Sequence, residues 1–127
     1  MLEIITKVKC SDEERIVKEI KKILDEIGAK RNFKGYRMWI TAAMYAINKS
    51  KSTYGEYEMK EVYENVSKRH KSTYIKSEKA MRYLLDDADK NKIKKFFEVS
   101  YKITNSIFLI LLVDKVADRL NSVVYRS

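Results

Sequence analysis

Side chains that could transfer protons or bind metals are few in this chain and form no catalytic pattern. The densest acidic group is the three aspartates of residues 86–89, while His70 and Cys10 are the single histidine and cysteine. Neighbouring side chains on a helix point about 100° apart, so Asp86 and Asp87 make a poor pair of metal ligands. The sequence has no glycine-rich phosphate loop and no serine–histidine–aspartate set. We therefore expect no catalytic residue, no metal and no cofactor, and we interpret His70 as a partly buried packing residue.

A second group of chemically capable side chains lies on one predicted helix, residues 74–90. Lys76, Lys79 and Arg82 fall in its first half, and the aspartates follow in its last turn. A helix that enters the major groove of DNA by its N-terminal half has this polarity, because the cations and the positive end of the helix dipole then meet the phosphates. Arg82 can donate two hydrogen bonds to guanine, and Glu78 can accept one from cytosine. The alternative is that these cations form the solvated face of an ordinary helix.

The net charge of +9 is concentrated in two segments of the chain. Residues 28–54 carry six cations and no acid, and residues 71–85 carry four cations and one acid. We expect the fold to bring both segments to one basic face, which would bind a polyanion, above all double-stranded DNA. The alternative is scattered charge that only keeps a small domain soluble.

The elements expected to carry these cations are helices. A chain of 127 residues suits one domain, and the absence of proline together with only three glycines favours helices. Ser11 and Glu14 have the spacing of a capping box, so the first helix is expected to start at Ser11 and to end before Gly28. Residues 1–10 are expected to form an N-terminal arm or a short strand, and residues 11–127 a single helical domain. Further helices are expected over residues 36–48, 59–70, 74–90 and 92–99 and after Thr104, which gives an all-α fold of about six helices.

The third and fourth predicted helices, joined at residues 71–73, have the layout of a helix-turn-helix at about residues 57–90. The fourth is expected to be the recognition helix. Helical periodicity places Lys76, Lys79 and Tyr83 on its outer side, with Arg82 on one flank. The inward face is expected to consist of Tyr74, Met81, Leu84, Leu85 and Ala88.

No segment is predicted to cross a membrane. The longest apolar run, residues 107–113, is about a third of the ~20 residues that a spanning helix needs. Residues 1–10 alternate apolar with charged side chains and lack the core of a signal peptide. We expect a cytoplasmic, nucleoid-associated protein with no membrane partner.

Four blocks of sequence stand out together, at residues 27–36, 62–69, 72–82 and 104–115. In their order and spacing they resemble the C-terminal effector domain of the stage 0 sporulation protein A family, over residues 23–121. The resemblance implies an all-α domain that binds DNA in the major groove, on A/T-rich tandem sites where two copies can lie side by side. It also implies RNA polymerase as a partner.

The resemblance also assigns roles to single residues. Glu78 and Arg82 match base-reading positions, and Lys76 and Lys79 stand where the family has arginine. Lysine lacks the two-pronged donor of arginine, so contacts there should be weaker or go to phosphates. Tyr83 replaces a histidine, which can change the preferred sequence. The predicted base-reading set is Glu78, Lys79, Arg82 and Tyr83, and the predicted phosphate-contacting set is Lys34, Gly35, Tyr36, Arg37, Lys68, Ser72, Thr73 and Lys76.

Two departures from the family shape the functional hypothesis. Residues 92–103 differ most, and they include part of the polymerase-contacting region. Only 22 residues precede Ile23, too few for the receiver domain that the family joins to this one. We expect a stand-alone, sequence-specific transcriptional regulator. The alternative is a protein-interaction module that keeps the fold, binds a regulator or RNA polymerase and has lost DNA binding.

Overall fold

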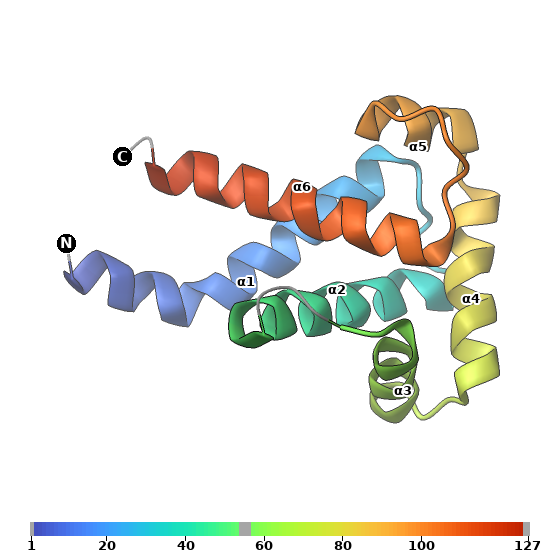
Figure 1. Ribbon diagram of the computed structural model, residues 1–127, viewed down its shortest axis with the longest axis horizontal. Coiled ribbons are helices and arrows are strands. Elements are labelled where there is room, and N and C mark those ends of the chain that lie inside the picture. Colours follow the sequence, from blue (N-terminus) through green and yellow to red (C-terminus); the bar gives the residue numbers. More distant parts are fainter. Residues whose placement is uncertain (1, 54–56, 126–127) are drawn as a thin grey trace.

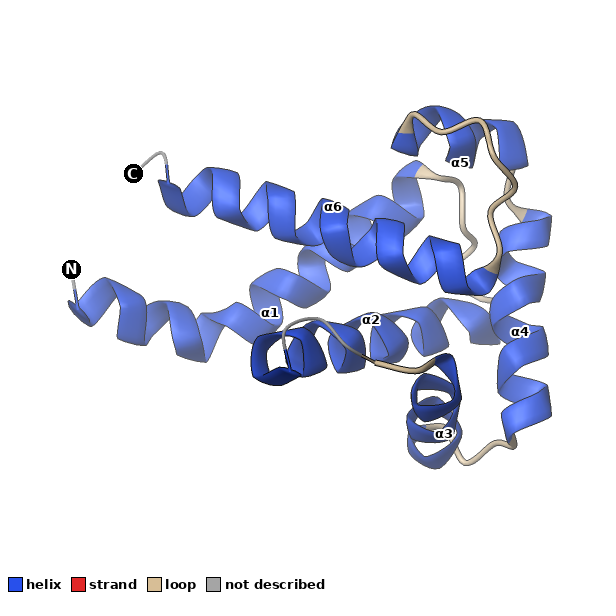
Figure 2. Cartoon of the chain, in the orientation of Figure 1, coloured by secondary structure: helices blue, strands red, loops and turns tan. Residues whose placement is uncertain are grey.

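The computed structural model describes the backbone of residues 2–53 and 57–125 and the side chains of residues 13–49 and 57–120. Over these residues the chain is all-helical, with six helices and no strand, as predicted (Figures 1 and 2). The helices are α1 (Leu2–Glu26), α2 (Lys34–Thr53), α3 (Met59–Arg69), α4 (Tyr74–Asp87), α5 (Lys90–Phe97) and α6 (Asn105–Tyr125).

Helix α2 is the centre of the packing, because it contacts α1, α3, α4 and α6. Its Trp39 is fully buried and meets Phe108 of α6 edge to face, with ring centroids 4.8 Å apart. Helices α1 and α6 pack against each other, and both chain ends lie at the side of the molecule opposite α4 (Figure 1). The fold therefore presents α4 at one end of the molecule.

Helix α1 starts earlier than predicted. It begins at Leu2, so Ser11 lies inside the helix and residues 2–10 are not a strand. No proline or glycine interrupts residues 2–27, so no residue breaks the helix and it continues through the predicted cap. The predicted stop at Gly28 is confirmed, since Gly28 has φ 85° and its N–H donates to the Asp25 carbonyl at 3.1 Å.

The boundaries of α2, α4 and α5 also differ from the prediction. Helix α2 begins at Lys34 and extends to Thr53, beyond the expected end at residue 48. Helix α4 ends at Asp87 because Asp89 caps α5, where its Oδ1 accepts a hydrogen bond from the Asn91 N–H at 2.9 Å. The acidic run of residues 86–89 therefore spans the end of α4 and the cap of α5.

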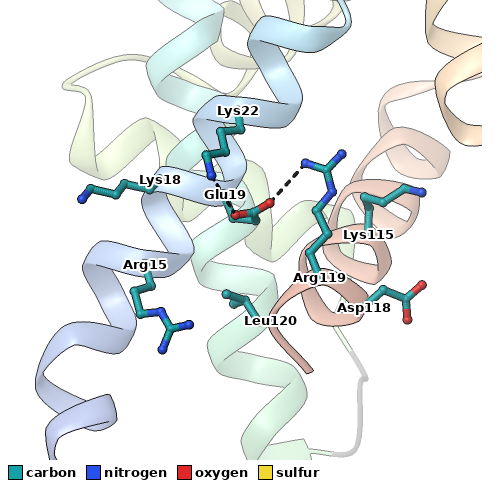
Figure 3. Close-up of a pocket in the computed structure, with 8 residues that line it drawn as sticks. All are labelled: Arg15, Lys18, Glu19, Lys22, Lys115, Asp118, Arg119 and Leu120. Carbon is teal, nitrogen blue, oxygen red and sulfur yellow. Dashed lines mark hydrogen bonds and ion pairs between the residues drawn. The ribbon is translucent and has the colours of Figure 1, made fainter. Parts of the chain in front are cut away.

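Arg119 joins α6 to α1. Its guanidinium donates to Glu19 at 3.1 Å (Figure 3). It also donates to Glu26 at 3.0 Å, so one side chain bridges two positions of α1. The two helices border an open cleft of about 580 Å³, which Arg15, Lys18 and Lys115 also line. These contacts hold α6 in place, and α6 in turn carries the buried side chains that pack on α2.

Gly35 allows the start of α2 to pack closely on α4. A Cβ atom at this position would collide with the carbonyl oxygen of Ala80 and would lie 3.0 Å from the Cβ of Leu84. Only a glycine leaves room for this approach of the two helices. Gly35 is therefore a packing residue, and its lack of a side chain sets the distance between α2 and α4.

We expect Gly35→Ala to lower the free energy of unfolding by about 1–3 kcal/mol, because the added methyl group must displace helix backbone. Urea denaturation measures the change. Lys34→Ala, at the neighbouring exposed position, is the control and should change stability by no more than about 0.5 kcal/mol. Equal stability of the Gly35→Ala variant and the parent would contradict the packing role.

Candidate nucleic-acid interface

Helices α3 and α4 form the predicted helix-turn-helix. Helix α3 ends with the His70 N–H donating to the Val66 carbonyl at 3.0 Å, and Lys71 adopts a left-handed conformation with φ 50°. The Ser72 N–H then donates back to the α3 carbonyl of residue 67 at 2.9 Å, which closes the turn. Thr73 caps α4, since its Oγ1 accepts a hydrogen bond from the N–H of residue 76 at 3.2 Å.

The inward face of α4 agrees with the prediction in all but two residues. Tyr74 was expected to be buried but is 42% exposed, and its ring meets the Tyr63 ring edge to face, with centroids 5.1 Å apart. Ser77 is fully buried instead and shares a 3.0 Å hydrogen bond with Ser67 of α3. Hydropathy does not reveal such a residue, because a serine can be buried wherever a partner satisfies its hydroxyl. The remaining members, Met81, Leu84, Leu85 and Ala88, are buried as predicted.

Other elements hold α4 by its backbone. The Trp39 indole N–H donates to the Met81 carbonyl at 2.9 Å. The Asn105 amide donates to the Glu78 carbonyl at 3.3 Å and to the Tyr63 hydroxyl at 3.1 Å. Helices α2 and α6 therefore fix α4 from its buried side without using any side chain on its outer face.

The predicted base-reading residues lie on one side of α4. Lys79, Arg82 and Tyr83 are exposed, and Glu78 is half-buried beside them. Arg82 Nε lies 3.2 Å from Glu78 Oε1, so the two residues with the clearest base preferences pair with each other. A solvent-exposed pair at this spacing contributes little to stability. Its donors and acceptors can therefore be exchanged for base edges at low cost.

Four of the predicted phosphate-contacting residues are exposed cations without an ion pair in the part of the chain that the structure describes: Lys34, Arg37, Lys68 and Lys76. Thr73 is also exposed, and Ser72 is half-buried next to it. Arg37 and Arg69 are both close enough to His70 to lower its pKa electrostatically. Cations from the start of α2 and the end of α3 therefore lie beside the turn.

Two residues of the predicted set do not fit it. Tyr36 is buried, and its hydroxyl donates to Asp25 at 2.9 Å, so it is not available to a phosphate. Burial and this hydrogen bond raise the pKa of Tyr36 to about 12. Gly35 is buried against α4 and serves packing. Both belong to the block of residues 27–36 that carries the family resemblance, but α2 turns them toward the core.

The basic stretch of residues 28–54 is also less available than its charge suggests. Lys30 pairs with Asp87 at 3.5 Å, Arg31 with Asp25 at 2.6 Å, and Lys49 lies 3.9 Å from Glu61. Only part of this stretch can therefore contribute charge to a partner. Sequence reasoning overlooked two cations at the turn, Arg69 and Lys71, both of which are exposed. Their position next to Lys68, where α3 ends, was the signal that could have identified them.

His70 packs between α3 and α2, as predicted. It is half-buried, and its Nε2 shares a 2.8 Å hydrogen bond with the Thr41 hydroxyl of α2. Burial lowers the pKa of the imidazole, and the positive charges of Arg69 and Arg37 lower it further. His70 is therefore a neutral residue that joins the helix-turn-helix to the central helix.

The described parts of the chain contain neither a metal-binding cluster nor a membrane-spanning helix. No group of three or more histidine, cysteine, aspartate or glutamate side chains could hold a metal ion there. None of the helices has the length and apolar character required to traverse a bilayer.

A buried inner face and an outer face of cations on the second helix define a helix-turn-helix DNA-binding domain. The family model described as "Sporulation initiation factor Spo0A C terminal" matches residues 20–116, and the chain belongs to this family. This family is the DNA-binding domain of a sporulation regulator and not an enzyme family. The chain is therefore a domain that binds double-stranded DNA in transcription regulation. Neither a curated protein nor a solved structure gives a significant match.

We expect the free energy of unfolding to fall as the pH decreases below about 6.5, the pKa of an unperturbed histidine. The unfolded chain then binds a proton that folded His70, with its lowered pKa, still rejects. Urea denaturation between about pH 5 and 8 measures the slope, to which His70 contributes as the single histidine of the chain. His70→Gln should flatten the slope in this range, and an unchanged slope would contradict the assignment.

Proposed function

We propose that the chain is a sequence-specific transcriptional regulator that inserts the first three turns of α4 into the major groove of DNA. The observation that carries the proposal is the charge order along α4. Exposed Lys76, Lys79 and Arg82 occupy its first three turns, whereas Asp86 and Asp87 follow at its C-terminal end. This order directs cations and the positive end of the helix dipole toward the phosphates and keeps the carboxylates away from them.

Within this arrangement we assign base reading to Glu78, Lys79, Arg82 and Tyr83. Arg82 would leave its pairing with Glu78 and donate two hydrogen bonds to guanine O6 and N7, which frees Glu78 to accept from cytosine N4. Phosphate contacts are assigned to exposed or half-buried side chains around the turn and the start of α2. These are Lys34, Arg37, Lys68, Arg69, Lys71, Ser72, Thr73 and Lys76.

Family membership supports three further parts of the proposal. The sites are A/T-rich and occur in tandem, so two copies of the chain bind side by side as a homodimer on DNA. RNA polymerase is the proposed protein partner, although residues 92–103 depart from the family in the region that contacts it. In the free chain this segment holds α5 and the loop that leads to α6.

Selection of binding sites from random duplexes tests this function, followed by affinity measurements over a range of salt concentrations. A regulator should prefer its selected site to random duplex by roughly 10³-fold or more. The logarithm of its binding constant should also fall by about 0.9 per phosphate contact for each tenfold rise in salt concentration. A protein-interaction module that has lost DNA binding would have no such affinity, and a non-specific binder would show the salt dependence without the preference.

We expect Arg82→Ala to weaken binding to the selected site by about 1–3 kcal/mol and to relax base preference at one position. The physical reason is the loss of the two-donor contact to guanine. Titration of labelled duplexes with single base changes measures both effects. Arg15→Ala, which removes the same charge from α1, is the matched control and should preserve the preference. Equal losses on selected and random duplexes would contradict base reading by Arg82.

We expect Lys34→Ala to weaken all duplexes alike and to reduce the salt slope by about one contact. Lys34 is exposed at the first position of α2 and pairs with no described acid, so its charge is available to a phosphate. Lys18→Ala, which removes an exposed lysine of α1, is the control. The assignment fails if Lys34→Ala changes the preferred sequence or if both variants have the same slope as the parent.

A further inference from the structure

Helix α4 exposes an unusual amount of apolar surface. Among the described side chains, five large hydrophobic ones are exposed, and three of these belong to the 14 residues of α4. They are Tyr74 at 42%, Ile75 at 65% and Tyr83 at 71% exposed. Tyrosine carries a hydroxyl that tolerates water, but isoleucine has no polar group. Ile75 is therefore the exposed side chain that most needs an apolar partner.

Ile75 also lies in the middle of the proposed base-reading face. With about 100° per residue, Arg82 projects about 20° to one side of Ile75 and Lys79 about 40° to the other. Glu78 and Tyr83 flank the same stripe at about 60° and 80°. Ile75 belongs to the first turn of α4, the end that would enter the groove. A side chain in this place faces base edges and not the phosphate backbone.

We propose that Ile75 reads a thymine by packing against its C5-methyl group, which makes it a specificity-determining residue of this chain. The methyl group of thymine is the apolar group that base edges display in the major groove. Isoleucine can neither donate nor accept a hydrogen bond, so it distinguishes a base by contact and by loss of water from both surfaces. This inference rests on the proposed function, since it requires α4 in the major groove.

Uracil substitution provides the test, because uracil keeps every hydrogen-bonding group of thymine and lacks only the methyl. Each thymine of the selected duplex is replaced in turn, and affinity is measured for the parent chain and for Ile75→Ala. We expect one uracil position to weaken binding of the parent roughly three- to tenfold. Ile75→Ala should bind the thymine duplex more weakly by a similar factor and should not distinguish thymine from uracil at that position.

The test is whether the loss of affinity caused by Ile75→Ala depends on the presence of the thymine methyl group. Coupling between Ile75→Ala and a single uracil position supports the contact. Independent losses, or no sensitivity of the parent to uracil at any position, would overturn it. Ile110→Ala is the matched control: Ile110 is 50% exposed on α6, outside the helix-turn-helix, and its removal should leave thymine discrimination intact. Thermal unfolding of both variants confirms that each retains the fold.

Failure of this inference can be distinguished from failure of the proposed function. Suppose that the parent selects a site and that Arg82→Ala relaxes its base preference, while Ile75→Ala shows no coupling to any uracil position. Then only the thymine contact is overturned. If the parent selects no duplex at all, the proposed function fails and the thymine contact fails with it.

Discussion

The hydrogen bond from the Trp39 indole to the Met81 carbonyl is the contact on which the position of α4 depends. Trp39 is fully buried on the central helix, so its N–H must find a partner inside the protein, and that partner is the backbone of α4. Gly35, one turn earlier on α2, brings the same two helices close together. A contact with backbone leaves the side chains of α4 free, so its outer face can vary while its position stays fixed.

The distribution of ion pairs separates the structural cations of this domain from those available to a partner. Arg119 bridges α6 to α1, and Arg31 is held by Asp25, so both charges serve the fold. Arg31 also keeps the pKa of Asp25 below its ordinary value. The cations near the turn and on the outer face of α4 include several without an acidic partner among the described residues, Lys34 and Lys76 for example. The charges of these unpaired cations are thus available to a partner at the α4 end of the molecule.

Much of this fold could be predicted from local sequence, and the errors have specific causes. The stop at Gly28, the cap at Thr73 and the buried Met81 and Leu84 follow from turn chemistry and helical periodicity. The start at Ser11 was wrong because a capping pattern does not begin a helix where no proline or glycine interrupts the segment before it. Sequence analysis located α4 and its outer face as part of the proposed interface. It did not assign Arg69, Lys71 or Ile75 to that interface.

The sequence by itself determined the six-helix composition, the helix-turn-helix and the cations of α4, because caps, glycines and apolar spacing act over a few residues. Only the tertiary structure decided which polar groups are used inside the protein. Sequence analysis placed Tyr36 among the phosphate contacts and assigned no role to Ser77. In the structure the Tyr36 hydroxyl donates to Asp25, and the Ser77 hydroxyl shares a hydrogen bond with Ser67. Such partners come from other helices, and a polar residue's burial depends on whether the fold brings it an acceptor or a donor.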